Sequence, residues 1–374
     1  MRMCYLAESV GRTGGNVVLF HHMEALSRDG HEVWLIGPYG KYKWAPGSLD
    51  PVMLNPGRTF KPWWRLLNRV RRQLHEAWPA AQGHAASGDM RTRAERVTER
   101  LLAQWRPCDM TIATHSFSAR AAAEKREVTQ AFYFMQGFEP WFDPDPAFQE
   151  ISLNSYSLPL SRIANSSWLQ EKVSGLTGDS VALVRPGLNH EVFWAKPEGR
   201  QDRTALPLHV VSYCDPRPLK GWSDSQEAMG IVFERQHSSA QLVWSVFGHR
   251  QPTTSSAPAT FAGFLPHRQL SALYRQADVV FVPSWFESFP LQPVEAMACG
   301  AAVVTTRIGT SDFAHNGDTA LVVEPREPAA LAEATLRLLG DSDLRHRLSS
   351  RGMEHVKKYT WTAAADELRA ALGL

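Results

Sequence analysis

Two glutamates stand in an almost uncharged stretch, SWFESFPLQPVEAMACGAAVV, which covers residues 284–304. Glu287 and Glu295 have seven residues between them. Carboxylates accept hydrogen bonds from hydroxyl groups well, so the pair could hold the sugar and ribose hydroxyls of one extended ligand. An ordinary alternative stays open, in which Glu295 is a solvated helix residue and Glu287 is a charge that interacts with the helix dipole.

The chain around the first glutamate also predicts a phosphate site. Residues 278–284, DVVFVPS, have the pattern of a strand, and a helix that contains PVEAMA begins a few residues later. Ligands of open α/β sheets bind at the carboxyl ends of strands, beside the first turns of the following helices. The backbone N–H groups of Ser288, Phe289 and Leu291 could point toward a bound anion, whereas Pro290 has no N–H group to offer. We therefore predict a phosphate-bearing ligand.

The elements that must position these residues follow a pattern of short apolar runs alternating with helical stretches. This pattern is typical of a parallel sheet wrapped by crossover helices. In the first half, strands are predicted in residues 3–9, 31–38, 110–115 and 131–136, with a helix in 16–30. After a polar stretch, 195–207, further strands are predicted in residues 208–214, 240–248, 259–265, 278–284, 301–306 and 319–325, and helical spacing in 267–277, 293–300 and 328–340. We predict an α/β fold of two units joined near residue 200.

Composition narrows the class of protein. The chain has 374 residues and is 44% hydrophobic, which is enough for two cores. Its 40 Lys and Arg residues nearly balance its 38 Asp and Glu residues, so we expect no nucleic-acid partner. The four cysteines are scattered without C-x-x-C spacing, which favours a reducing compartment. With no signal-peptide layout and no membrane-span pattern, we expect a cytoplasmic protein; its oligomeric state is not predicted.

The segment around Glu287 and Glu295 resembles the E-x7-E motif of the large retaining glycosyltransferase family often called family 4. The likeness extends through GFLPHRQLSALYRQADVVFVPSWFES and TRIGTSDFAHNGDTALVVEPREPAALAEATLRLL, and it covers most of residues 205–350. The resemblance implies that Glu287 contacts hydroxyls of the transferred sugar, that Glu295 contacts the nucleotide ribose, and that Leu265 lies at the donor.

The same resemblance implies the GT-B fold, in which two Rossmann-like domains have parallel sheets that face each other across a cleft. We expect an acceptor domain at residues 1–198 and a nucleotide-sugar donor domain at 199–358. Residues 359–374 are expected to form a C-terminal helix that crosses back to the first domain.

The diphosphate leaving group requires positive charge in the transition state. In the family a lysine and an arginine follow the first strand of the second domain, where VVSYCDPRPLKGW places Lys220 beside Gly221. Asp215 occupies the usual position of the arginine, and Arg217 follows two residues later. We predict that Lys220 and Arg217 bind the diphosphate, with the alternative that Arg217 is only a surface residue.

The N-terminal half resembles the family more weakly. GRTGGN places Gly14 on the acceptor side and Gly15 at the donor, where glycine lets backbone approach a ligand closely. His115 ends a predicted strand and resembles a histidine near the transferred sugar, although a lone histidine is often structural. AFYFMQGFEPWFDPD resembles a subset that includes S-layer rhamnosyltransferases, which implies that Gln136 and Glu139 lie on the acceptor side.

No metal cofactor is predicted. Two D-x-D matches could hold a divalent cation in glycosyltransferases of another fold. However, Asp143 and Asp145 alternate with prolines in a loop, and Asp341 and Asp343 begin a predicted helix as cap residues. The resemblance likewise implies a metal-independent enzyme.

Residues 61–78 have the pattern of a basic amphipathic helix. Trp63, Leu67, Val70, Leu74 and Trp78 recur at helical intervals, and arginines line another face. Such a helix could rest on an anionic membrane surface, at the inner face of the membrane, and reach a lipid-linked acceptor. The alternative is an ordinary helix that packs on the N-terminal core.

The sequence therefore predicts a retaining, metal-independent glycosyltransferase that moves a sugar from a nucleotide diphosphate sugar to a hydroxyl of a glycan, lipid-linked or small-molecule acceptor. Two other classes stay open: a nucleotide-sugar 2-epimerase and a non-catalytic nucleotide-sugar binding protein. A nicotinamide-dependent oxidoreductase is disfavoured, because G-x-G-x-x-G is absent. The patterns do not identify the donor base, the sugar or the acceptor.

Overall fold

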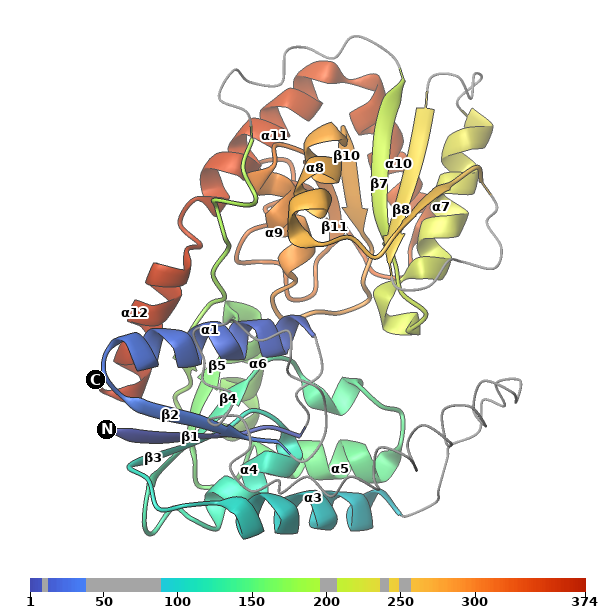
Figure 1. Cartoon of the computed structure of the whole chain (residues 1–374). Helices are drawn as coiled ribbons and strands as arrows, with labels where there is room; N and C mark the ends of the chain where they lie inside the picture. The colour runs from blue at the N-terminus through green and yellow to red at the C-terminus, as the bar shows by residue number, and fades with distance from the viewer. Residues whose placement is uncertain (9–12, 38–88, 196–206, 236–241, 249–256) are drawn as a thin grey trace, which may run out of the picture. The chain divides into compact units, whose positions relative to one another are not determined.

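The computed structural model describes residues 1–8, 13–37, 89–195, 207–235, 242–248 and 257–374 (Figure 1). The predicted basic helix at residues 61–78 lies outside these described residues. Within them, no helix combines the length and the apolar character that crossing a bilayer requires.

The first sheet has six strands in the order β2-β1-β3-β4-β5-β6. Its strands are β1 (Arg2–Leu6), β2 (Glu32–Ile36), β3 (Met110–Ala113), β4 (Gln130–Met135), β5 (Ser161–Ala164) and β6 (Ala182–Leu183). The accompanying helices are α1 (Gly14–Arg28), α3 (Met90–Gln104), α4 (Ser116–Ala123), α5 (Pro146–Ser155) and α6 (Ser167–Thr177). β1 pairs in parallel with β2 and β3, and four of its five residues are buried. Continuous burial of this kind is typical of a central parallel strand.

The second sheet also has six strands, in the order β12-β11-β10-β7-β8-β9, and its pairings are parallel. Its strands are β7 (Leu208–Cys214), β8 (Leu242–Gly248), β9 (Thr260–Gly263), β10 (Val279–Val282), β11 (Ala302–Thr306) and β12 (Leu321–Val323). Its helices are α7 (Trp222–Arg235), α8 (His267–Gln276), α9 (Leu291–Ala298), α10 (Pro328–Gly340) and α11 (Ser342–Val356), followed by α12 (Trp361–Leu372). Two parallel sheets with crossover helices confirm the predicted α/β class.

Successive residues of β10 send their side chains to opposite faces of the second sheet. Val280 and Val282 belong to a buried cluster with residues of α8 and α9. Val279 and Phe281 belong to another cluster with residues of α7 and α10. The sheet is therefore covered on both sides, as the run of apolar residues requires.

Contacts between residues divide the chain into two compact units. The first comprises Met1–Phe134 and Glu139–Ser161, and the second comprises Met135–Phe138 and Arg162–Leu374. In the second unit α12 contacts β6, and the backbone N–H of Leu188 donates to the carbonyl of Tyr359 at 3.0 Å. The domain boundaries expected from the resemblance stay a prediction.

The two D-x-D sequences lie at helix starts. The Asp145 side chain accepts a hydrogen bond from the backbone N–H of Ala147 at 2.8 Å and caps α5. The Asp341 side chain accepts from the N–H of Leu344 at 2.8 Å, so the predicted cap of α11 is confirmed. Side chains in these roles satisfy the orphan N–H groups of a first turn.

Candidate functional site

Lys220 and Glu287 form an ion pair in the second unit. The Nζ of Lys220 lies 2.5 Å from Oε1 of Glu287, and the two side chains are 21% and 16% exposed. Lys220 ends a 3-10 helix, Pro218–Lys220, after β7, and Glu287 follows β10. β7 and β10 are neighbours in the sheet, so two residues 67 positions apart meet at its carboxyl edge. This is the edge at which open α/β sheets bind ligands.

Two glycines allow the backbone to hold this pair. Gly221 directly follows Lys220 at φ +65°, and a Cβ there would lie 2.1 Å from the carbonyl oxygen of Pro283. Gly309 has φ +76°, and its Cβ would lie 2.0 Å from the carbonyl oxygen of Glu287. A larger residue at either position would displace the backbone beside the ion pair.

Arg217 is held by Asp215 beside the same edge. Its Nε and Nη2 donate to Oδ1 and Oδ2 of Asp215, both at 2.8 Å, while the Tyr213 hydroxyl donates to Oδ2 at 2.9 Å. Burial opposes the charge of Asp215, but the hydrogen bonds from Arg217 and Tyr213 outweigh it and lower the pKa of Asp215 to about 2. The Arg217 side chain is nevertheless 62% exposed. The guanidinium of Arg217 is therefore accessible to solvent, but it already forms a bidentate ion pair with Asp215.

The segment that links β10 to α9 presents unused N–H groups. α9 begins at Leu291 after Pro290, which gives no side-chain cap. Within the part of the chain that the structure describes, no protein group accepts a hydrogen bond from the backbone N–H of Ser288, Phe289 or Leu291. Unsatisfied N–H groups at a helix start attract anions. These three residues therefore form a candidate phosphate cradle, as the sequence predicts.

Glu295 is buried without a donor. It lies in α9, is 7% exposed, and accepts no hydrogen bond from any described residue. Burial raises the pKa of its carboxyl group to about 8. The hydroxyl of Tyr274 is also buried without a hydrogen-bond partner, and Glu295 is among the charges that raise the pKa of Tyr274 after burial itself. The burial excludes a solvated Glu295, which was the alternative interpretation of the sequence.

Apolar packing fixes the remaining residues of this segment. Phe289 lies edge-on to Phe313 and Tyr359, with ring centroids 5.4 Å and 5.2 Å away. Leu291 and Leu265 are partly buried and pack against the cluster that contains α8 and α9 residues. The second unit contains all the predicted donor residues except Gly15: Arg217, Lys220, Leu265, Glu287, Ser288, Phe289, Leu291 and Glu295.

In the first unit, His115 lies between two carboxylates. It caps α4, and its Nδ1 accepts a hydrogen bond from the N–H of Phe117 at 3.3 Å, which leaves the ring proton on Nε2. Nε2 lies 3.4 Å from both Glu8 and Glu139. The sequence alone gave no signal for Glu8, because nothing local links it to residue 115.

Glu139 is 2% exposed, and each of its two carboxylate oxygens accepts a hydrogen bond. Its Oε1 accepts from the Tyr133 hydroxyl at 2.6 Å, and its Oε2 accepts from the N–H of Ser116 at 2.9 Å. The structure thus gives this carboxylate a role in holding His115 and the start of α4. Direct contact of Glu139 with an acceptor stays a prediction.

The other predicted residues have less defined surroundings. Gly14 begins α1, and a Cβ there would meet nothing within 4 Å. Gly15 follows it and is partly buried. Gln136, in the second unit, has a buried Oε1 without a hydrogen-bond partner. The structure does not bring Gly14, Gly15, His115 and Glu139 into the unit that holds Lys220 and Glu287.

Part of the chain that contains these residues is similar to known glycosyltransferases. Residues 211–341 match the family described as glycosyl transferases group 1, and this segment contains Lys220, Glu287 and Glu295. D-inositol 3-phosphate glycosyltransferase of Corynebacterium diphtheriae is 31% identical over 216 residues, which are 52% of this chain and 51% of that protein. The chain spans about half the length of the curated relatives it matches.

Two solved structures align with the whole chain. Sucrose-phosphate synthase from Thermosynechococcus elongatus has a TM-score of 0.71 and 19% identity, covering 100% of this chain and 98% of that one. Anabaena Alr3699/HepE, solved in complex with UDP-glucose, has a TM-score of 0.67 and 17% identity, covering 100% and 99%. The chain therefore has the GT-B fold of these proteins.

Proposed function

We propose that this chain, a GT-B protein with a glycosyl transferases group 1 segment, is a retaining, metal-independent glycosyltransferase of the family 4 type. It takes a sugar from a nucleotide diphosphate sugar and transfers it to a hydroxyl of an acceptor. The observation that carries the proposal is the Lys220–Glu287 pair at the carboxyl edge of the second sheet, together with a buried Glu295 in α9 that has no donor among the described residues. A buried carboxylate without a donor is costly, so a ligand that brings hydroxyl groups would be strongly favoured there.

Each residue has a separate task in this proposal. Lys220 leaves Glu287 for the diphosphate and stabilises the charge that develops on it. The N–H groups of Ser288, Phe289 and Leu291 bind the same phosphates. Glu287, released from Lys220, accepts hydrogen bonds from hydroxyls of the transferred sugar, and Glu295 accepts them from the ribose. Because the lysine and backbone supply the positive charge, no metal is required.

Transfer then exchanges one bond for another at the anomeric carbon. The bond to the diphosphate oxygen breaks on the same face of the sugar on which the acceptor oxygen forms its bond. The acceptor proton passes to the departing diphosphate oxygen, so no side chain of the protein becomes a covalent intermediate. The names of similar proteins support glycosyl transfer from a nucleotide sugar: the Corynebacterium protein is called a glycosyltransferase, and Anabaena Alr3699/HepE was solved with UDP-glucose.

A thermal-shift panel tests donor binding first. UDP-glucose, GDP-mannose, ADP-glucose and dTDP-rhamnose are added separately in EDTA, because a ligand that binds only the folded state raises the unfolding temperature. We expect one nucleotide to raise it and Glu295→Ala to reduce that rise. If no nucleotide sugar shifts the wild-type protein, the proposed function is wrong.

Product analysis then separates the function classes. A transferase hydrolyses its donor slowly in the absence of acceptor, whereas an epimerase releases a changed nucleotide sugar. A binding protein, which the engagement of Arg217 by Asp215 would favour, leaves the donor intact. The anomeric configuration of a transferred product, followed by NMR, tests retention directly.

A further inference from the structure

Asp312 is a buried carboxylate that is not among the predicted donor residues. It lies in the turn after β11, and its side chain is 4% exposed. Its Oδ2 accepts from the N–H of Ser167 at 2.8 Å, and its Oδ1 accepts from the Ser167 hydroxyl at 2.7 Å and from Nε of Arg185 at 2.8 Å. Asp312 therefore joins the turn after β11 to the first turn of α6, and both lie in the second unit.

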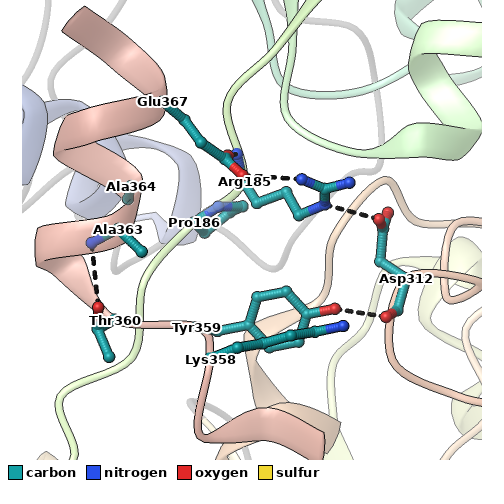
Figure 2. Close-up of a pocket in the computed structure, with 9 residues that line it drawn as sticks. All are labelled: Arg185, Pro186, Asp312, Lys358, Tyr359, Thr360, Ala363, Ala364 and Glu367. Atoms are coloured by element: carbon teal, nitrogen blue, oxygen red, sulfur yellow. Dashed lines mark hydrogen bonds and ion pairs between the residues drawn. The ribbon is translucent and has the colours of Figure 1, made fainter. Parts of the chain in front are cut away.

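Arg185 extends this connection to the C-terminal helix (Figure 2). Its Nη1 lies 2.8 Å from Oε1 of Glu367 in α12, and its backbone N–H donates to Oε2 of Glu367 at 2.6 Å. Burial opposes the charge of Arg185, but Asp312 and Glu367 outweigh it and raise the pKa of the guanidinium. Arg185, Asp312 and Glu367 line a cavity of about 230 Å³ together with Lys358 and Tyr359. Its four charged side chains cancel in sign, so the cavity itself is no anion site.

The turn that holds Asp312 also touches the backbone of Glu287. The N–H of Glu287 donates to the carbonyl of Ile308 at 3.3 Å, and Gly309 lies directly against the Glu287 carbonyl. Phe313, one residue after Asp312, packs on Phe289. The position of this turn therefore limits where the Glu287 segment can lie.

A second connection reaches the same segment from α6. Ser166, the cap of α6, lies 2.9 Å from the Ser288 hydroxyl, which also donates to Asn165. Tyr359, the partner of Phe289, donates its hydroxyl to the Asp312 carbonyl. Residues 165–167 thus contact both Ser288 and Asp312, and all of these residues lie in the second unit.

We propose that Asp312 is a positioning residue for Glu287: its hydrogen bonds to Ser167 and Arg185 hold the turn against which the Glu287 segment rests. This inference depends on the proposed function, because it assigns a consequence for the sugar that Glu287 would contact. Asp312 is not among the residues that we assign to the donor. When the Asp312 side chain changes, the Ser288 hydroxyl keeps its contacts with Asn165 and Ser166, and Phe289 keeps its contact with Tyr359. The loss of Asp312 should therefore act mainly through Glu287, and so more on the sugar part of the donor than on the nucleotide.

A double-mutant cycle with Asp312→Asn and Glu287→Gln tests the inference. The probes are the nucleotide sugar that gives the largest shift in the panel above and its nucleoside diphosphate, both titrated by calorimetry. Asp312→Asn should weaken the nucleotide sugar by about five- to tenfold, the scale of coupling within one hydrogen-bond network, and leave the diphosphate within about twofold. In the Glu287→Gln background, the same substitution should cause no further loss.

Asp318→Asn is the matched control. Asp318 is on the same connection between β11 and β12, but its ion pair with Arg351, at 2.9 Å, is solvent-exposed on both sides. This variant should bind both probes as the wild type does. Arg185→Lys, which keeps the charge but loses the two-sided hydrogen bonding, replaces Asp312→Asn if that variant does not fold.

The outcomes separate the two hypotheses. Additive losses in the cycle, or equal losses for the nucleotide sugar and the diphosphate, would overturn the positioning role while leaving the proposed function intact. Absence of any nucleotide-sugar binding by the wild type would remove the proposed function itself, and the inference with it.

Discussion

Glu139 in the first unit and Glu295 in the second are both buried carboxylates, but only one has partners. Glu139 is 2% exposed and accepts hydrogen bonds from Tyr133 and Ser116, with His115 beside it. Glu295 is 7% exposed and receives none from the described residues. Burial alone therefore does not mark a binding residue. A buried carboxylate with satisfied oxygens holds structure, whereas one without donors is prepared for a ligand.

The cationic groups differ in the same way. Lys220 is paired with a single carboxylate, Glu287, that a sugar could take over. Arg217 is bound by both oxygens of Asp215, which a ligand would have to displace. The first ion pair can open to admit a diphosphate at lower cost than the second, because bidentate pairs are the stronger ones.

The largest effect should come from Lys220. We expect Lys220→Ala to lower donor hydrolysis or transfer by about 10²- to 10³-fold, since it removes charge stabilisation of the leaving group. Steady-state kinetics measure the loss, and urea unfolding of the same variant reports separately the cost of leaving Glu287 without its partner. Arg217→Ala is the matched variant and should lower the rate by about tenfold or less. An equal or greater loss for Arg217→Ala would show that the guanidinium leaves Asp215 and carries the diphosphate.

Glu139→Ala should cost the most stability. The substitution strands the Tyr133 hydroxyl and the Ser116 N–H in a buried position, and we expect a loss of about 3 kcal/mol in the free energy of unfolding. Urea unfolding followed by circular dichroism measures this loss. Glu150→Ala, which removes an exposed partner of Arg91, should cost less than about 1 kcal/mol and serves as the control. If Glu139→Ala is about as stable as the wild type, the conclusion that Glu139 holds His115 and the start of α4 is wrong.

Glu295 should show an effect that depends on pH. Its pKa in the folded protein is about 8, above the ordinary value of 4.5, so the folded state retains a proton that the unfolded state releases. Stability contributed by the protonated group is therefore lost as the pH rises from about 4.5 to about 8. Relative to wild type, Glu295→Gln should gain about 3 kcal/mol of unfolding free energy between pH 5.5 and pH 8.5.

Thermal or urea unfolding at these two pH values measures that gain. Glu287→Gln is the control, because Glu287 already has Lys220 as its partner. A stability difference between Glu295→Gln and wild type that stays constant over this range would mean that Glu295 is ionised in the folded protein and has a donor.

The elements that sequence periodicity predicted well are those with strong local signals. Residues 208–214 and 328–340 have the predicted bounds as β7 and α10, because a short, mostly apolar run and a regular helical repeat each specify their own ends. Helix α3 was not predicted: its sequence, MRTRAERVTERLLAQ, carries many charges and a narrow apolar face. β6 was not predicted either: it has only two residues, Ala182–Leu183, too few to give a strand pattern.

The sequence by itself determined the α/β class, the two glutamates with seven residues between them and the lysine beside a glycine, because such patterns depend on residues close together in the chain. Tertiary structure alone decided that Lys220 meets Glu287, that Glu295 is buried without a donor, and that Glu8 and Glu139 flank His115. These facts depend on which strands become neighbours and which side chains fill the space between elements. Local sequence does not encode such pairings, because contacts between distant residues arise only when the sheet forms.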